Sequence, residues 1–144
     1  MQENKTPVVI GVSSITQKGN YEDLDEALIL MDMATKNAIK DCANEDIKKY
    51  IDEISIPKGY WKYRDPGKWV AENNNIKNIK TSITKVGVLQ QNIINKAALK
   101  IQEGSINASL IIGGESRYKR VIASKLGKNY IETELNINPD EYIK

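Results

Sequence analysis

The sequence predicts an α/β domain with three layers, in which helices cover both faces of a mostly parallel sheet. Short continuous apolar runs, such as Val8–Val12 and Ala108–Ile112, are typical of strands that are buried on both faces. Segments with helical spacing of apolar residues alternate with these runs. A chain of 144 residues is long enough for one domain with a core. The expected order of elements is therefore βαβαβαβ.

The first strand and helix are expected before residue 43. Pro7 opens the apolar run Val8–Val12, which we interpret as a central parallel strand. A helix with an apolar strip follows from Leu24 to Cys42, with Asn20 or Asp23 as its expected cap. Cys42 belongs to that strip and has no cationic neighbour, so we interpret it as a small core residue and not as a reactive thiol.

The second strand is expected over Ile51–Ile56, and an aromatic loop follows it. Pro57 closes the strand, and residues 58–69 contain both tryptophans of the chain together with two tyrosines. Two interpretations remain open. The rings pack over the sheet edge or a partner subunit, or the loop faces a ligand, with Lys62 and Arg64 on phosphate and a ring stacked on a base.

A short helix over Gly67–Glu72 and a third strand over Ile79–Val86 come next. In this strand Ile79, Thr81 and Ile83 alternate onto one face. An unpaired strand edge here is a liability that dimerisation would remove.

The best-defined unit is a helix and strand near the middle of the chain. Apolar residues from Val88 to Glu103 cover more than one helix face, so we expect this helix to be largely buried. It ends at Gly104, which suits a left-handed helix terminus. The strand Ala108–Ile112 then leads to Gly113 and Gly114, where a backbone or a ligand can approach closely.

The last part of the chain is polar. Residues 116–126 are expected to form a basic helix, which is either a phosphate site at the carboxyl end of a strand or a solvated face. Residues 127–144 are expected to be a loosely packed tail, the remnant of a linker. The predicted domain therefore covers residues 1–126.

Composition excludes several classes of function. The net charge is +2, from 21 basic and 19 acidic residues, and gives no support for nucleic-acid or general membrane binding. The absence of His removes the commonest general base and metal ligand, so no metal site is expected. A single Cys suits a reducing compartment, and no apolar run has the length of a membrane span. We therefore expect a cytoplasmic protein.

The unit from Lys85 to Ser116 also resembles the amino-terminal half of the thiolase superfamily. The likeness lies in the turn Val86–Gln91, the Ala-rich helix, Gly104 and the strand ending in Gly-Gly-Glu-Ser. It is closest to the thiolase-like acetyl-CoA acetyltransferases of the sterol-carrier-protein type, and it extends over about Pro7–Arg117. In that family the nucleophilic Cys stands at the start of this helix, and the third strand pairs with its copy in a dimer.

The resemblance implies a protein of lipid metabolism that acts on or binds acyl-CoA thioesters, with coenzyme A as substrate or ligand and no other cofactor. The family's nucleophile position falls at Gly87, which has no thiol, so no catalytic residue is assigned and the chain is expected to be inactive alone. Gly87, Gly113, Gly114 and Arg117 are the expected substrate-binding residues. A homodimer, or a partner chain carrying the carboxyl-terminal half, is the expected assembly.

Three hypotheses about function remain open at this stage. The chain is one subunit of a split thiolase-like acyltransferase, or a non-catalytic acyl-CoA-binding or scaffold subunit of the same superfamily. In the third, the likeness to thiolases is distant and the chain is a flavodoxin-like binding module.

Overall fold

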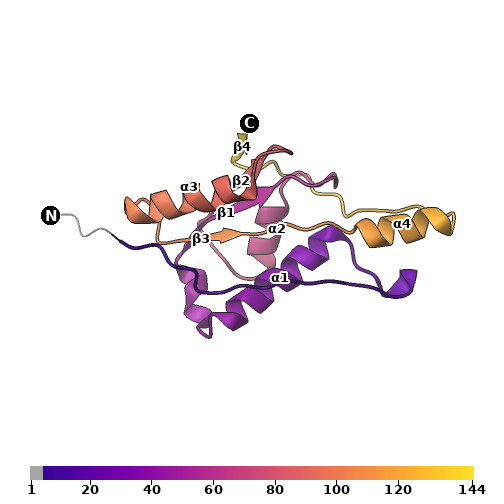
Figure 1. Cartoon of the computed structure of the whole chain (residues 1–144), viewed down its shortest axis with the longest axis horizontal. Coiled ribbons are helices and arrows are strands. Elements are labelled where there is room, and N and C mark those ends of the chain that lie inside the picture. The colour runs from indigo at the N-terminus through magenta and orange to yellow at the C-terminus, as the bar shows by residue number, and fades with distance from the viewer. Residues whose placement is uncertain (1–4) are drawn as a thin grey trace.

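The computed structural model describes residues 5–144 and forms one α/β unit around a small sheet (Figure 1). The strands are β1 (Ile51–Pro57), β2 (Lys80–Thr84), β3 (Ala108–Ile111) and β4 (Glu141–Ile143). The α-helices are α1 (Ala27–Asp41), α2 (Pro66–Asn73), α3 (Gln90–Gln102) and α4 (Arg117–Lys125). Two 3₁₀ turns, η1 (Tyr21–Asp23) and η2 (Glu45–Lys49), flank α1.

All strand pairs in this sheet are parallel, and the strand order is β3-β1-β2-β4. Ile54 of β1 stands opposite Thr81 of β2 on one side and Leu110 of β3 on the other. The chain moves from β1 to β2 in one direction and then crosses back to β3. The strand order therefore reverses between β1 and β3, and loops after these two strands leave the same edge of the sheet.

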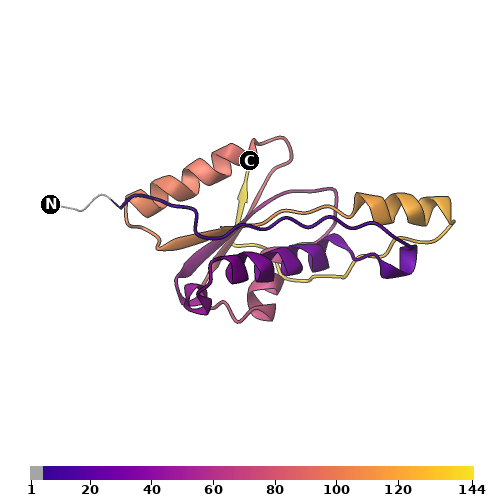
Figure 2. The ribbon, with the colours of Figure 1, turned by 60° about the horizontal axis from the view of Figure 1, so that its bottom comes forward.

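Helices lie on both faces of the sheet, with α1 and α2 below it and α3 above it in Figure 2. The apolar core fills the face under α1 and α2, where Ile54, Ile56 and Ile83 meet Leu28 and Met31. The opposite face, which α3 covers, carries Ser and Thr side chains from the strands. The three-layer α/β prediction is thus confirmed at the level of architecture, with one apolar and one polar layer.

A buried carboxylate joins the two helices of the core layer. Asp32 of α1 accepts hydrogen bonds from the side-chain amide of Asn74 at 2.7 Å and from the Lys36 amine at 2.5 Å. Asn74 is the C-cap of α2, and both Asp32 and Asn74 are buried. Burial acts to raise the pKa of Asp32, but the hydrogen bonds from Lys36 and Asn74 outweigh it and hold the pKa below its ordinary value.

Most elements fall where the sequence predicts them. β1 ends at Pro57, β2 buries Thr81 and Ile83, and α3 ends just before Gly104, whose φ of +76° is left-handed. The expected cap of the first helix is wrong, because η1 intervenes and Glu26 takes the N-cap position without a side-chain hydrogen bond.

The predicted first strand, Val8–Val12, is also wrong. β1 pairs directly with β3, so no central position is left, and the segment runs unpaired past α1 with Val9 78% exposed. It is held at its end, where the Val12 N–H donates to the Asp41 carboxylate at 2.9 Å. Gly11 is needed there, since a Cβ would lie 2.3 Å from the Ala38 carbonyl oxygen.

The expectation that α3 is largely buried is wrong as well. Within α3 the buried residues are Ile93 and Ala97, whereas Ile94 is 45% and Leu99 is 57% exposed. The helix covers the sheet with one narrow stripe because no second layer lies over it in this structure. A cavity of about 540 Å³ separates α3 from the segment 7–13.

The carboxyl-terminal segment is not loosely packed. β4 pairs with β2 in parallel from Ser82 to Thr84, and the Lys85 N–H donates to the Ile143 carbonyl at 2.8 Å. The Asp140 carboxylate also accepts from the Thr81 N–H at 2.8 Å. The outer edge of β2, expected to meet a second subunit, is therefore occupied by the chain's own end.

Replacing Asp32 by Ala is expected to lower the free energy of unfolding by about 1–3 kcal/mol, because one of the two N–H groups of the buried Asn74 amide loses its acceptor, while the other still donates to the Val70 carbonyl. The exposed pair Asp46–Lys49 supplies the control, and Asp46→Ala should cost about 0.5 kcal/mol or less. Urea unfolding measures both variants. Equal losses would contradict the assigned role.

The stability that Asp32 contributes should also depend on pH, and the sign of this dependence follows from the lowered pKa of Asp32. The stabilisation is fully present above the unfolded-state pKa of about 3.9 and is lost as pH falls through the lower folded-state value. The stability difference between wild type and Asp32→Ala should therefore shrink as the pH is lowered below about 4. A difference that stays constant down to acid unfolding would count against a charged Asp32.

Candidate functional site

The loop that follows β1 alternates between buried and exposed side chains. Trp61, Tyr63 and Asp65 point into the protein, while Tyr60, Lys62 and Arg64 are exposed. The packing role that the sequence left open is therefore confirmed for the buried side chains of the loop, and the ligand-facing role stays a prediction for the exposed ones. The odd-numbered residues of the loop pack, and its even-numbered residues are presented to solvent.

The buried rings fix the loop to the core. Trp61 is 1% exposed and stacks on Tyr63, with the two ring centroids 5.4 Å apart. The Trp61 indole N–H donates to the Gly114 carbonyl at 3.0 Å, so the loop after β1 is tied to the loop after β3. The Lys58 amine lies 3.8 Å from the Trp61 ring centroid, and burial lowers its pKa.

Tyr63 connects the same loop to the start of α1. Its hydroxyl accepts from the Leu28 N–H at 3.2 Å and donates to the Glu26 carboxylate at 2.7 Å. It thereby supplies the cap that the Glu26 side chain does not give to α1. Burial and the hydrogen bond to Glu26 both raise the pKa of Tyr63, so the hydroxyl keeps its proton.

Carboxylates hold the outer part of the loop against the carboxyl-terminal segment. Glu132 accepts from the Lys62 N–H at 2.8 Å and from the Arg120 guanidinium at 3.2 Å. Glu26 accepts from the Thr133 N–H at 2.8 Å and also bonds the Thr133 hydroxyl. The backbone of this loop is therefore fixed on both sides, which positions its exposed side chains.

These contacts enclose a cleft of about 730 Å³ beyond the carboxyl ends of β1 and β3. We call it the switch-point cleft, because the strand order reverses between these two strands. In open parallel sheets this position is the usual place for a ligand. The cleft is lined by Tyr60, Lys62, Arg64, Arg120, Tyr130, Ile131, Glu132, Thr133, Glu134, Leu135 and Asn136.

Three cations, two carboxylates and two tyrosine rings line the cleft. Lys62 and Arg64 form no ion pair within residues 5–144, whereas Arg120 is paired with Glu132. The Arg120 guanidinium carbon lies 5.0 Å from the centroid of the Tyr130 ring. Burial raises the pKa of the Tyr130 hydroxyl.

Two buried polar atoms in this cleft have no partner within the described chain. They are the Nε of Arg120 and the hydroxyl oxygen of Tyr130. Both are hydrogen-bond donors, and a buried donor without a partner is costly. The contact between α4 and the 130–136 segment is thus incompletely hydrogen-bonded.

None of the four residues predicted as substrate-binding, Gly87, Gly113, Gly114 and Arg117, lines the switch-point cleft. Gly87 lies in an exposed turn with φ +97° and open space around it. Gly113 and Gly114 leave little room for a side chain. A Cβ added at Gly113 would lie 3.0 Å from Pro57 Cγ, and one added at Gly114 would lie 3.2 Å from Met31 Cγ. Arg117 is exposed at the start of α4 and does not line the cleft.

No family model, no curated protein and no solved structure gives a significant match to this chain. The described helices include none that is long and apolar enough to cross a membrane. Residues 5–144 likewise contain no group of three or more His, Cys, Asp or Glu side chains placed to hold a metal ion.

The sequence indicated Lys62, Arg64 and the basic helix that carries Arg120 as possible phosphate contacts, but it did not place them in one cleft. It missed Tyr130 and Glu132, which lie in the segment expected to be a loose tail. Neither residue belongs to a periodic pattern, because their segment is irregular and is held by side-chain contacts. The one available signal was the strict alternation of rings and cations in the loop.

Tyr63→Phe should lower the free energy of unfolding by about 1–3 kcal/mol, because it leaves the buried Leu28 N–H without its acceptor and removes one of the donors to the Glu26 carboxylate. Tyr60→Phe in the same loop is the matched control, since Tyr60 is 79% exposed and should change stability by less than about 0.5 kcal/mol. Urea unfolding followed by tryptophan fluorescence measures both. Two equally mild variants would show that the Tyr63 hydroxyl is not a structural cap.

Proposed function

We propose that this chain binds a coenzyme A thioester without transforming it, and that the switch-point cleft holds the nucleotide phosphates. The observation that carries the proposal is the convergence of unpaired cations and aromatic rings at the carboxyl edge of a parallel sheet. A volume of about 730 Å³ lies in the range of small-molecule and cofactor sites.

The geometry supports phosphate contacts better than contacts to a neutral ligand. The unpaired cations Lys62 and Arg64 stand on one wall and Arg120 on the other. A guanidinium binds phosphate oxygens through two parallel hydrogen bonds, whereas an ammonium acts as a point charge. The exposed Tyr60 ring offers a surface on which a base can stack.

Binding rather than chemistry is proposed because neither a thiol nor an imidazole lines the cleft. The sequence contains no His, and its single thiol, Cys42, follows α1 and does not line the cleft. Formation of a carbon–carbon bond between thioesters needs both an acyl carrier and a base. Gly87, the family's nucleophile position, is also outside the cleft, so the proposal concerns the nucleotide end of the ligand.

Calorimetric titration of acetyl-CoA should show binding that weakens with added salt. The double variant Lys62→Ala/Arg64→Ala should bind at least about tenfold more weakly, since it removes two charge-assisted contacts. Lys77→Ala is the matched control, because Lys77 is exposed and precedes β2, at the opposite end of the sheet. Pantetheine, which lacks the nucleotide, should give no heat.

Each alternative has its own result in this experiment. Binding of flavin mononucleotide in place of acetyl-CoA would favour the flavodoxin-like module. Equal affinities of the double variant and the Lys77 control would show that the cleft is not the site. Absence of any heat with all of these ligands would overturn the proposal and leave the scaffold function.

The scaffold alternative is favoured by a second observation, the apolar surface around α3. Ile94 is 45% exposed beside the cavity that the 7–13 segment lines, where Val9 is 78% exposed. Soluble monomers seldom expose large continuous apolar patches. We infer that a second copy or a partner chain covers this face.

The purified chain should therefore self-associate in light-scattering measurements over a wide concentration range. Ile94→Lys should reduce the association, because a charge is placed on the apolar face, whereas Leu126→Lys at the far end of α4 should not. A wild-type chain that stays monomeric at high concentration would contradict self-association. Equal effects of the two lysine variants would remove the α3 face as its site.

A further inference from the structure

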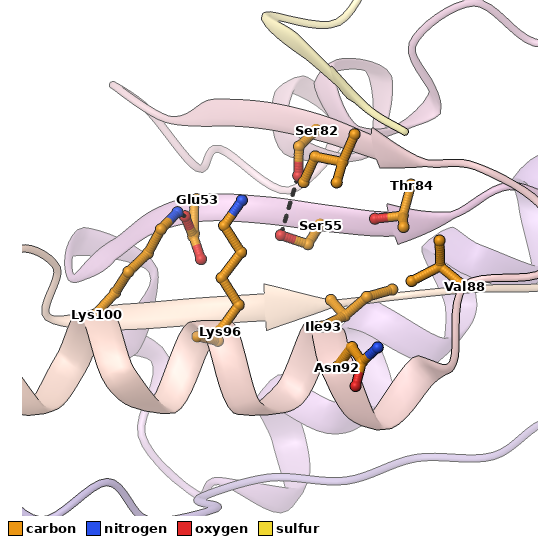
Figure 3. Close-up of a pocket in the computed structure, with 11 residues that line it drawn as sticks. Glu53, Ser55, Ser82, Thr84, Val88, Asn92, Ile93, Lys96 and Lys100 are labelled. Atoms are coloured by element: carbon orange, nitrogen blue, oxygen red, sulfur yellow. Dashed lines mark hydrogen bonds and ion pairs between the residues drawn. The ribbon is translucent and has the colours of Figure 1, made fainter.

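The sheet face under α3 is polar, which is unusual for the interior of a three-layer fold. A groove of about 80 Å³ lies between this face and α3 (Figure 3). We call it the α3 groove. It is lined by Glu53, Ser55, Ser82, Thr84, Val88, Asn92, Ile93, Lys96, Ala97, Lys100 and Ile143. None of these residues lines the switch-point cleft.

Part of the polar floor is already satisfied. The Ser82 hydroxyl lies 3.1 Å from that of Ser55, as the dashed line in Figure 3 shows. The buried Glu53 carboxylate accepts from the Lys100 amine at 2.5 Å and from the Ser109 hydroxyl at 3.0 Å. The charge of Glu53 is thereby balanced, and it does not repel an anion from the rest of the groove.

Thr84 is the exception on this floor. Its side chain is 1% exposed, and its hydroxyl oxygen has no hydrogen-bond partner within the described chain. Figure 3 shows that oxygen pointing into the groove, toward Ser55. A buried hydroxyl without a partner is destabilising, so a ligand that places a polar atom here would gain a hydrogen bond.

A positive field lies over the same floor. Lys96 reaches from α3 toward the strands in Figure 3, and it forms no ion pair within residues 5–144. The first turn of α3 is at the same end as Thr84 and contributes Asn92 to the lining. The Leu89 carbonyl at the N-cap accepts from the Asn92 N–H, but the Leu89 side chain has no oxygen for the other N–H groups of this turn. The partial positive charge of the turn is therefore not offset by a side-chain cap.

We propose that the α3 groove binds a small carboxylate with a short apolar tail. The carboxylate accepts from the Thr84 hydroxyl and from the Lys96 amine. The tail lies against Val88, Ile93 and Ile143, which form the apolar wall. The volume has room for a few water molecules, so a ligand with a long chain is excluded and acetate or propionate is the fitting size.

The test uses the full chain and amide NMR spectra recorded at constant ionic strength, with acetate or propionate exchanged for chloride. Saturable shifts are expected at Thr84, Asn92 and Lys96. Thr84→Val keeps the shape of the side chain but removes the hydroxyl, and it should weaken binding about tenfold. Lys96→Met should also weaken it, whereas Lys125→Met on the exposed end of α4 is the control and should not.

A stability measurement distinguishes a ligand-binding role of the Thr84 hydroxyl from a purely structural role. Because Thr84 has no protein partner, Thr84→Val should keep or raise the urea midpoint while it weakens carboxylate binding about tenfold. Thr84→Ser should retain both the shifts and the fold. A lowered midpoint in Thr84→Val together with no carboxylate shifts in wild type would overturn the proposal.

Two further outcomes bear on the kind of ligand. Shifts that do not saturate, or that are the same in Thr84→Val and Lys96→Met as in wild type, would show general screening of surface charge and no site. Saturable binding of phosphate without binding of acetate would overturn the carboxylate and its apolar tail. The variants of the switch-point cleft leave this groove intact, so failure of one site is distinguishable from failure of the other.

Discussion

The structure depends most on the way one loop is fixed at the carboxyl edge of the sheet. Trp61 and Tyr63 are buried by the core, and the hydroxyl and indole groups of these rings bond α1 and the loop after β3. Large aromatic side chains give more buried area than any other residue, and their polar ends must find partners when buried. The loop after β1 is therefore held in place by these two residues. Exposed neighbours such as Lys62 and Arg64 gain fixed positions from it without contributing to the core.

The same constraint explains why the polar end of the chain is ordered. The 130–136 segment has no regular secondary structure, yet Glu132 and Thr133 bond the loop and the start of α1. These bonds use charged acceptors and backbone donors, which are stronger than neutral pairs. They bring the chain back along the sheet, and Asp140 then sets β4 against β2 through Thr81. Order in this segment therefore comes from side-chain contacts with distant elements and not from local propensity.

That difference marks the limit of what the sequence could predict. β1, α2 and β3 are found where their periodicity and their Pro and Gly boundaries place them, because local pattern and burial agree there. Val8–Val12 has the composition of a buried strand but pairs with none, since partner choice is a non-local property. Glu141–Ile143 has a weaker pattern and does pair. The cleft could not be assembled from sequence for the same reason: its cations come from a loop and a helix that meet only through the sheet order.

The two faces of the sheet carry different side chains, apolar on one face and polar on the other. Under α1 and α2 the strands present Ile side chains, and this layer holds the apolar core. Under α3 the same strands present hydroxyls and a carboxylate, which add little apolar burial. A fold selected for stability alone would place an apolar residue at Thr84, because a buried hydroxyl without a partner lowers stability. Polar residues that break this rule in an otherwise consistent fold are characteristic of functional sites. The α3 face is for that reason the part of the molecule where a ligand or a covering chain has the most to contribute.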